Sequence, residues 1–326
     1  MDLEQIKSTI KQSRPNLSDM SLSIYSQNVK KVVGKNEPKI LKNKQYILDF
    51  LEGKSASTKR NYLNSILIFL KVDENKSNKK IIRELEVLRD SEQDKYLGDN
   101  ENGKVSETQQ KNLVEWTEIL KVVDSVTKLV KDKNLLKKKP EDFKKPEYTL
   151  LQTYILLNLY TKLPPLRNDY SGMKVLGKQQ FKDLKISERE KGNWLVTDLR
   201  TYMKIYINNF KTQGVYDEII IDTKDIPKDL RLILNKFIMQ FNLKNDYLFK
   251  IFNTDKPITR NGITMLLTNI FKKILKKNIS TTLLRKSYVS HKYNDMMKEQ
   301  QKDAKTMGHS VATANKIYNK DIKKDD

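Results

Sequence analysis

The residues best suited to chemistry lie in the last fifth of the chain. Arg285 lies in an apolar stretch, His309 is one of only two histidines, and Tyr318 comes nine residues after it. Ser310 is placed to cap a helix over 311–318, so the tyrosine would lie about two and a half turns beyond the histidine. Such a set suits attack on a phosphodiester: the tyrosine is the nucleophile, and the cations neutralise charge that grows on the phosphoryl oxygens.

Two further cations stand in settings that favour a role at the same site. Arg167 follows an apolar segment, 148–160, which predicts a buried helix. Lys211 lies near the tip of the turn 208–214 between two predicted strands. Lys204, within the first of these strands, is the rival for the role of Lys211.

The composition bounds the partners and cofactors of the chain. A net charge of +22 over 326 residues indicates a polyanionic partner, most simply nucleic acid, although a lysine-rich solvated surface is the alternative. The absence of cysteine excludes disulfides and thiolate metal sites, and two histidines make an imidazole metal site improbable. We therefore expect no metal and no cofactor. Neither a bilayer-spanning run nor a signal peptide is visible, so we expect a soluble, intracellular protein that binds no membrane.

The first part of the chain, 1–100, is predicted to form a small helical domain. Apolar residues recur at helical spacing in five segments, with Ser18 and Ser57 as helix starts. The polar, turn-rich segment 96–105 is predicted to be a hinge that separates this domain from the second domain, 101–326.

The second domain is predicted to combine helices with a small sheet. Helical patterns begin at Ser106 and resume at 229–241 and 259–276. Three short runs between them are rich in β-branched and aromatic residues and predict strands, at 194–197, 203–207 and 215–221. We therefore predict a mainly α protein whose second, α+β domain contains a three-stranded antiparallel sheet.

Taken in order, Arg167, Lys211, Arg285, His309 and Tyr318 resemble the catalytic set of the tyrosine recombinases, the phage-integrase family. The segment Leu-Leu-Arg-Lys-Ser-Tyr around Arg285 is similar to the second arginine box of that family, and Met-Gly-His-Ser around His309 is similar to its Leu-Gly-His-Ser segment. The helical first domain resembles the core-binding domain of the family, so the resemblance covers nearly the whole chain.

The resemblance implies a mechanism in which Tyr318 attacks a DNA phosphorus and leaves a 3′-phosphotyrosine. Arg167 and Arg285 would bind the non-bridging oxygens, His309 would donate a further hydrogen bond, and Lys211 would protonate the leaving 5′-oxygen. Such chemistry needs neither metal nor ATP.

This chain departs from the family in three places. Thr282 stands where the second box usually has histidine, and a hydroxyl cannot act as a base near pH 7. Tyr170 stands where the family often has glutamate, with Asp169 one residue earlier. Only eight residues follow Tyr318, fewer than the helix that many recombinases use to dock on a neighbouring subunit.

The leading hypothesis is a site-specific recombinase or integrase of a virus or mobile element. The partner that the resemblance implies is double-stranded DNA, and we expect a monomer in solution that assembles into a homo-oligomer on it. Two alternatives remain open at this stage. A type IB topoisomerase has a similar site and tolerates a residue other than histidine in the second box, and a DNA-binding protein without catalysis would also fit the departure at Thr282.

Overall fold

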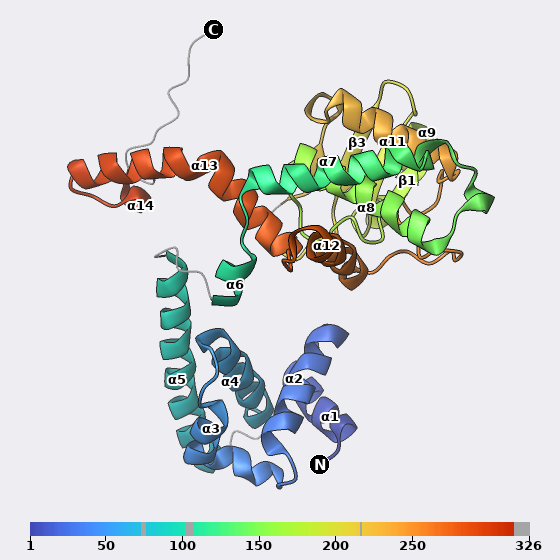
Figure 1. The fold of residues 1–326 in the computed structure, drawn as a ribbon. Coiled ribbons are helices and arrows are strands. Elements are labelled where there is room, and N and C mark those ends of the chain that lie inside the picture. Colours follow the sequence, from blue (N-terminus) through green and yellow to red (C-terminus); the bar gives the residue numbers. More distant parts are fainter. Residues whose placement is uncertain (73–75, 102–106, 216, 316–326) are drawn as a thin grey trace. The chain divides into compact units, whose positions relative to one another are not determined.

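The computed structural model describes residues 1–72, 76–101, 107–215 and 217–315, so the predicted nucleophile Tyr318 lies outside the described residues. The chain divides into two compact units, Met1–Ser106 and Glu107–Asp326. Each unit has its own hydrophobic core, and each is described here by itself (Figure 1).

The first unit is entirely helical within its described residues. Its elements are α1 (Leu3–Ser13), α2 (Asp19–Val33), the 3₁₀ helix η1 (Pro38–Lys42), α3 (Lys44–Leu51), α4 (Ala56–Leu70) and α5 (Lys76–Glu101). Fully buried aliphatic side chains from four of the helices, such as Ile6, Val29, Leu63 and Leu85, form its core.

Serine caps set the helix starts in this unit. Ser18 accepts from the backbone N–H of Ser21, and Ser55 accepts from that of Thr58, which satisfies donors that have no partner within the helix. The cap of the fourth helix is therefore Ser55, two residues before the predicted cap at Ser57.

The predicted hinge over 96–105 is wrong in its first half. Helix α5 continues through Gly98 to Glu101, and residues 102–106 lie outside the described part of the chain. A single glycine inside a helix costs only about 1 kcal/mol relative to alanine, so the good helix formers before it extend the helix beyond the turn-rich signal.

The second unit contains most of the helices and the sheet. Its helical elements are α6 (Glu107–Asn112), α7 (Trp116–Asp132), η2 (Leu135–Lys137), η3 (Pro140–Asp142), α8 (Lys145–Lys162), α9 (Lys178–Asp183), α10 (Ile186–Arg189), η4 (Thr223–Asp225), α11 (Lys228–Gln240), α12 (Arg260–Leu275), α13 (Thr281–Thr306) and α14 (Val311–Thr313). Helix α8 is the central element: it is buried along almost all of its length, from Tyr148 to Tyr160.

The sheet has four strands in sequence order: β1 (Lys174–Leu176), β2 (Asn193–Thr197), β3 (Met203–Ile207) and β4 (Ile219–Ile221). Strands β2, β3 and β4 pair antiparallel, whereas β1 pairs parallel to β2. The prediction of a mainly helical protein with a small sheet is confirmed, but the sheet is mixed and four-stranded. Strand β1 was missed because three residues are too few to show a periodicity.

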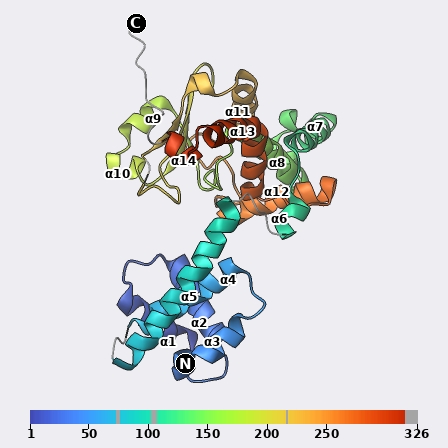
Figure 2. The ribbon, with the colours of Figure 1, turned by 90° about the vertical axis from the view of Figure 1, so that its left-hand side faces the viewer.

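The two faces of the sheet pack differently. Met203, Ile205 and Ile207 of β3 join the main core of the unit. On the opposite face, Trp194 and its neighbours pack against Phe181 of α9. Figure 2 shows the result, with α9 and α10 on one side of the unit and α7 and α8 on the other.

Candidate functional site

Arg167 lies on the loop that leaves the C-terminal end of α8. The hydroxyl of Tyr160, in the last turns of α8, donates to the backbone carbonyl of Arg167. The amide of Asn168 donates to Thr264 Oγ1 of α12 at 2.9 Å, and Ser171 Oγ donates to the carbonyl of Ile258 at 2.8 Å. These bonds fix the loop at several points, so the exposed side chain of Arg167 starts from a held backbone.

Arg285 lies in the second turn of α13, on the packed part of that helix. Ser280 caps the helix, and Leu284 is fully buried in the main core. Ser287 Oγ donates to the carbonyl of Val114 at 2.8 Å, and the ring of Tyr288 packs edge-to-face on Trp116, with centroids 5.4 Å apart. The first two turns of α13 are therefore anchored to the core, and Arg285, in the second turn, is held half-buried.

The two arginines lie close enough to repel each other. Burial and the positive charge of Arg167 lower the pKa of Arg285, while the negative charge of Asp169 opposes the shift. Within the part of the chain that the structure describes, neither guanidinium donates a hydrogen bond to another protein group. Two like charges with unused donors form a site that an anion would stabilise.

A buried carboxylate and a third arginine complete the group. Asp169 is buried, and burial raises its pKa although Arg260, Arg167 and Arg285 act in the opposite direction. Arg260, the first residue of α12, approaches Asp169 Oδ1 with its Nη2 at 3.7 Å. We call Arg167, Asp169, Arg260 and Arg285 the arginine cluster. Its three cations outnumber its one acid.

A single buried amide, that of Asn193 at the start of β2, ties the cluster to the turn after β3. Its Nδ2 donates to the carbonyl of Asp169 at 2.7 Å, and its Oδ1 accepts from the backbone N–H groups of Asn208 and Asn209 at 2.9 and 2.8 Å. Arg260 Nη2 adds a bond to the carbonyl of Asn209 at 3.2 Å. Lys211, two residues further on, therefore lies on a turn that is bonded directly to the cluster.

The rival lysine on β3 is already engaged. Lys204 Nζ pairs with Asp222 at 2.7 Å, and this hydrogen bond raises the pKa of the lysine. Lys211 is exposed on the turn and, among the described residues, has no carboxylate partner. Of the two lysines, Lys211 is the one whose ammonium is available to a ligand of the cluster.

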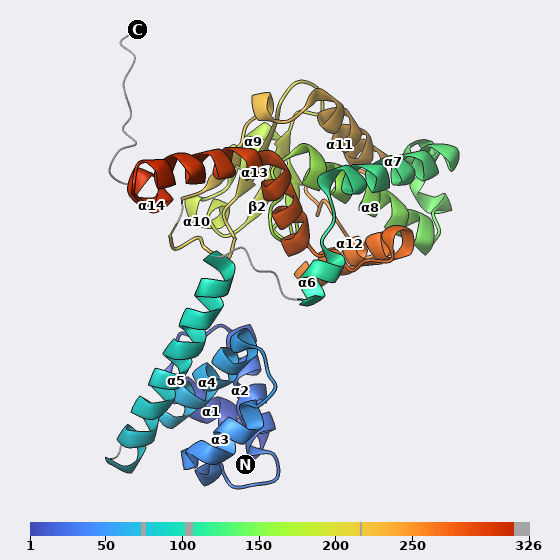
Figure 3. The same cartoon turned by 60° about the vertical axis from the view of Figure 1, so that its left-hand side comes forward.

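His309 is not brought to the cluster. It follows α13, whose 21 residues from Arg285 to Thr306 span about 30 Å at about 1.5 Å per residue. There, the backbone N–H of His309 donates to the carbonyl of Ala304 at 3.0 Å. In Figures 1 and 3, α13 extends beyond helices α7, α8 and α12 toward α14. The predicted helix over 311–318 begins at Val311, capped by Ser310.

Three residues of the cluster and its frame were missed or undervalued from the sequence. Asn193 follows a glycine, and a Gly-Asn pair is common in turns, so its place in the sequence did not single it out. Arg260 is one of many arginines and lysines in the sequence. Asp169 was noted only as a departure from a family pattern.

Thr282, which occupies the second-box position, is exposed on α13.

Other kinds of site find less support in the described residues. These contain no group of three His, Cys, Asp or Glu side chains placed to hold a metal ion. They also contain no helix with the length and apolar character needed to cross a bilayer. In the first unit, two cations of α4 are engaged within the protein: Lys59 pairs with Glu92 at 4.0 Å, and Arg60 donates to Gln93 and lies over the ring of Tyr96.

The unpaired guanidinium donors of Arg167 and Arg285 can bind a tetrahedral anion. Lys211, on the turn bonded to the cluster, can lie beside such an anion. Comparisons with family models, with curated proteins and with solved structures give no match to this chain. The functional conclusion therefore rests on the geometry and on the resemblance of the ordered residues.

Proposed function

We propose that this protein is a site-specific DNA recombinase or integrase that cleaves and rejoins strands through a phosphotyrosine. The observation that carries the proposal is the pair Arg167 and Arg285, two neighbouring guanidinium groups with unused donors beside a buried carboxylate. Planar guanidinium groups match the non-bridging oxygens of a phosphodiester in a paired geometry that lysine cannot reproduce.

The residues of the arginine cluster and Lys211 have different tasks in this proposal. Arg167 and Arg285 neutralise the charge that grows on the phosphoryl oxygens during attack. Asp169 attracts both of these arginines by its charge, and Arg260 holds Asp169 and the turn after β3 in place. The oxygen of Tyr318 loses its proton to solvent water and bonds to the phosphorus, while the bond from phosphorus to the 5′-oxygen breaks and Lys211 gives that oxygen a proton, which makes it a hydroxyl. The reverse attack by a 5′-hydroxyl reseals the strand and frees the tyrosine.

The proposal requires the chain end to approach the cluster, and the second half of α13 allows this. Residues 291–299 are all exposed, and among them His291 stacks on the ring of Trp116, with centroids 6.5 Å apart, so a bend beyond His291 would leave this contact in place. The cost is limited to the helical hydrogen bonds of about one turn. A bend in this segment would return His309 toward Arg285.

The domain roles and the assembly belong to the same proposal. The first unit, with its separate helical core, is proposed as a core-binding domain that grips DNA together with the second unit. The net charge of +22 favours such a grip, because each neutralised phosphate releases counterions. We propose a monomer in solution that assembles into a homo-oligomer on paired DNA sites.

The test is a covalent adduct on a nicked substrate that loses its 5′-hydroxyl fragment after cleavage, so that resealing is blocked. Candidate DNA comes from the ends and flanks of the element that encodes the protein. Wild-type protein should give a denaturant-resistant protein–DNA adduct, and Tyr318→Phe should bind the same DNA without forming it.

Tyr288→Phe is the matched control, because this ring packs on Trp116 and should not be attacked. An adduct that survives Tyr318→Phe, or that maps to Tyr288, would refute the assignment. Fast relaxation of any supercoiled plasmid, with no joined products from candidate sites, would instead identify a type IB topoisomerase. Binding without any adduct would leave a DNA-binding protein that does not cleave.

A further inference from the structure

A second basic surface lies at the other end of α8. The segment that joins α7 to α8 and the last turn of α11 enclose a hollow of about 730 Å³. We call this the lysine hollow; its lining residues are Val130, Lys131, Asn134, Leu136, Lys137, Lys138, Lys236, Met239 and Gln240. The set combines an apolar floor with four lysines.

The frame of the lysine hollow is fixed by one side chain. Gln240 Nε2 donates to the carbonyls of Leu135 and Lys138, at 2.7 and 2.6 Å, and so fastens the joining segment to the end of α11. The Oε1 atom of the same amide is buried and accepts no hydrogen bond from any described residue. The joining segment and the end of α11 are therefore held together without a ligand, so the hollow is already formed.

The charges of the rim are mostly available to a ligand. Lys138 pairs with Glu147 at 2.7 Å, whereas Lys131, Lys137 and Lys236 are exposed and have no carboxylate partner among the residues that the structure describes. Met239, which also lines the hollow, leaves 64% of its surface exposed, so an apolar group of a ligand could pack on it.

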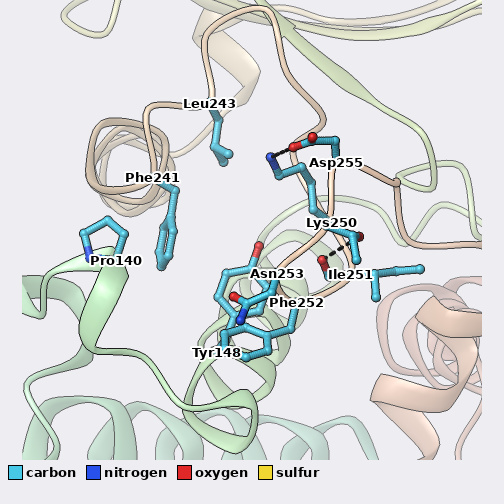
Figure 4. A pocket seen from close by; sticks show the side chains of 10 residues that line it. Pro140, Tyr148, Phe241, Leu243, Lys250, Ile251, Phe252, Asn253 and Asp255 are labelled. Carbon is cyan, nitrogen blue, oxygen red and sulfur yellow. Dashed lines mark hydrogen bonds and ion pairs between the residues drawn. The ribbon is translucent and has the colours of Figure 1, made fainter.

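A neighbouring hollow on the same joining segment is aromatic. It encloses about 280 Å³ between Pro140, Tyr148, Phe241 and Phe252, as Figure 4 shows. The rings of Tyr148 and Phe241 lie 5.2 Å apart and edge-on, so this site is rigid. Gln240 and Phe241 are consecutive, which means that one extended chain could reach both hollows.

The lysine hollow is separate from the arginine cluster. From Glu147, beside the hollow, to Tyr160, beside Arg167, α8 runs 13 residues, or about 20 Å. A ligand in the hollow would therefore not compete with an anion between Arg167 and Arg285.

We propose that the lysine hollow docks an acidic peptide segment of a partner protein that carries a large apolar side chain. Carboxylates of the segment face Lys131, Lys137 and Lys236, and the apolar side chain fills the space over Leu136 and Met239. Nucleic acid fits less well, because a phosphate backbone has no apolar group for this floor, and desolvating a phosphate there is unfavourable. Apolar anchors with a charged rim are the usual chemistry of peptide grooves.

The experiment measures fluorescence anisotropy with the full chain and a labelled 12-residue peptide of Glu and Asp with a central Leu-Trp pair. The double variant Lys137→Glu/Lys236→Glu should weaken binding at least about tenfold, through lost attraction and added repulsion. The control Lys182→Glu/Lys185→Glu changes the net charge equally on α9 and just after it, across the unit (Figure 2), and should change affinity less than about twofold.

Two further arms separate the occupants. A peptide with Gly-Gly in place of Leu-Trp should bind about tenfold more weakly to wild-type protein, and Met239→Ala should weaken the Leu-Trp peptide but not the Gly-Gly peptide. The hollow variant should bind a 12-bp duplex as the control variant does. Equal losses in both double variants, equal binding of the two peptides, or a duplex loss as large as the peptide loss would each overturn the proposal. Thermal unfolding checks that all variants are folded.

Discussion

The two ends of α8 both carry groups of positive side chains, and they differ in what lies between the charges. At the C-terminal end, Arg167 and Arg285 lie close enough to repel each other, and the negative charge of the buried Asp169 attracts both. At the N-terminal end, exposed lysines surround an apolar floor formed in part by Met239. The first environment offers fixed paired donors to a small anion, whereas the second offers loose charges and a space for an apolar group.

The comparison teaches that net charge alone does not identify a ligand. A charge of +22 is consistent with DNA at every basic patch, yet of the two ends of α8 it is the arginine cluster that offers the guanidinium donors proposed to bind one phosphate. Changes at the two ends of α8 should therefore have different effects, and the largest is expected at Arg285.

Arg285→Ala should slow single-turnover DNA cleavage about 10²–10³-fold, because a preorganised donor at the reacting phosphate is lost. DNA affinity should change little, since one phosphate contact is removed among many. The hollow variant Lys137→Glu/Lys236→Glu should cleave normally once DNA is bound. A strong loss of affinity in Arg285→Ala, with normal cleavage of bound DNA, would make Arg285 a backbone-binding residue and erase the contrast between the two ends.

Arg260→Ala should have a smaller effect, about 10- to 100-fold on cleavage, because Arg260 acts by holding Asp169 and the turn that carries Lys211. Arg260→Lys should recover only part of the rate, as it keeps the charge but loses the fork of donors. A substrate with sulfur at the bridging 5′ position needs no proton on its leaving group. It should therefore restore cleavage by Lys211→Ala but not by Arg167→Ala, and it should restore Arg260→Ala only in part, because Arg260 also holds Asp169. Full rescue of Arg260→Ala would limit its role to the turn that carries Lys211.

The distance across α13 should shorten on DNA. The chain has no cysteine, so single cysteines for spin labels can replace the exposed residues Val289 and Met307. Eighteen residues of helix place these positions about 27 Å apart along the axis. Cognate DNA should add a population well below that distance, as the segment 291–299 bends. An unchanged distance in a complex that forms the adduct would show that the chain end reaches the cluster of another molecule.

The smallest effect concerns stability at Asp169. Its pKa is raised above the ordinary 3.8, so the folded state keeps the proton to higher pH than the unfolded chain. The contribution of Asp169 to the free energy of unfolding therefore falls as the pH rises from about 3.8 through the folded pKa. Urea unfolding should show Asp169→Asn gaining stability relative to wild type over this rise. If Asp169→Asn instead lost stability relative to wild type as the pH rises, the three arginines would be lowering the pKa of Asp169.

The sequence predicted the elements better than it predicted the site. Strong apolar stripes foretold α4 and α8, and β-branched runs foretold β2 and β3, because these patterns are local. The bonds of Asn193 join residues 24 and 16 positions away, and no local pattern encodes such partners. The sequence also did not indicate that α13 continues past Tyr288 to Thr306. The second half of this helix has helix-forming residues, but because it does not pack on the core it lacks the apolar stripe from which a helix is predicted.

The central claim is that the guanidinium of Arg285 neutralises charge on the phosphate that is cut. The most direct measurement compares wild type with Arg285→Ala on the DNA that gives the adduct, and on the same DNA with a neutral methylphosphonate at the cleaved position. The account predicts that the penalty of about 10²–10³-fold on the ordinary phosphate shrinks to about tenfold or less on the methylphosphonate, because the charge that Arg285 opposes is gone. An equal penalty on both substrates would contradict it.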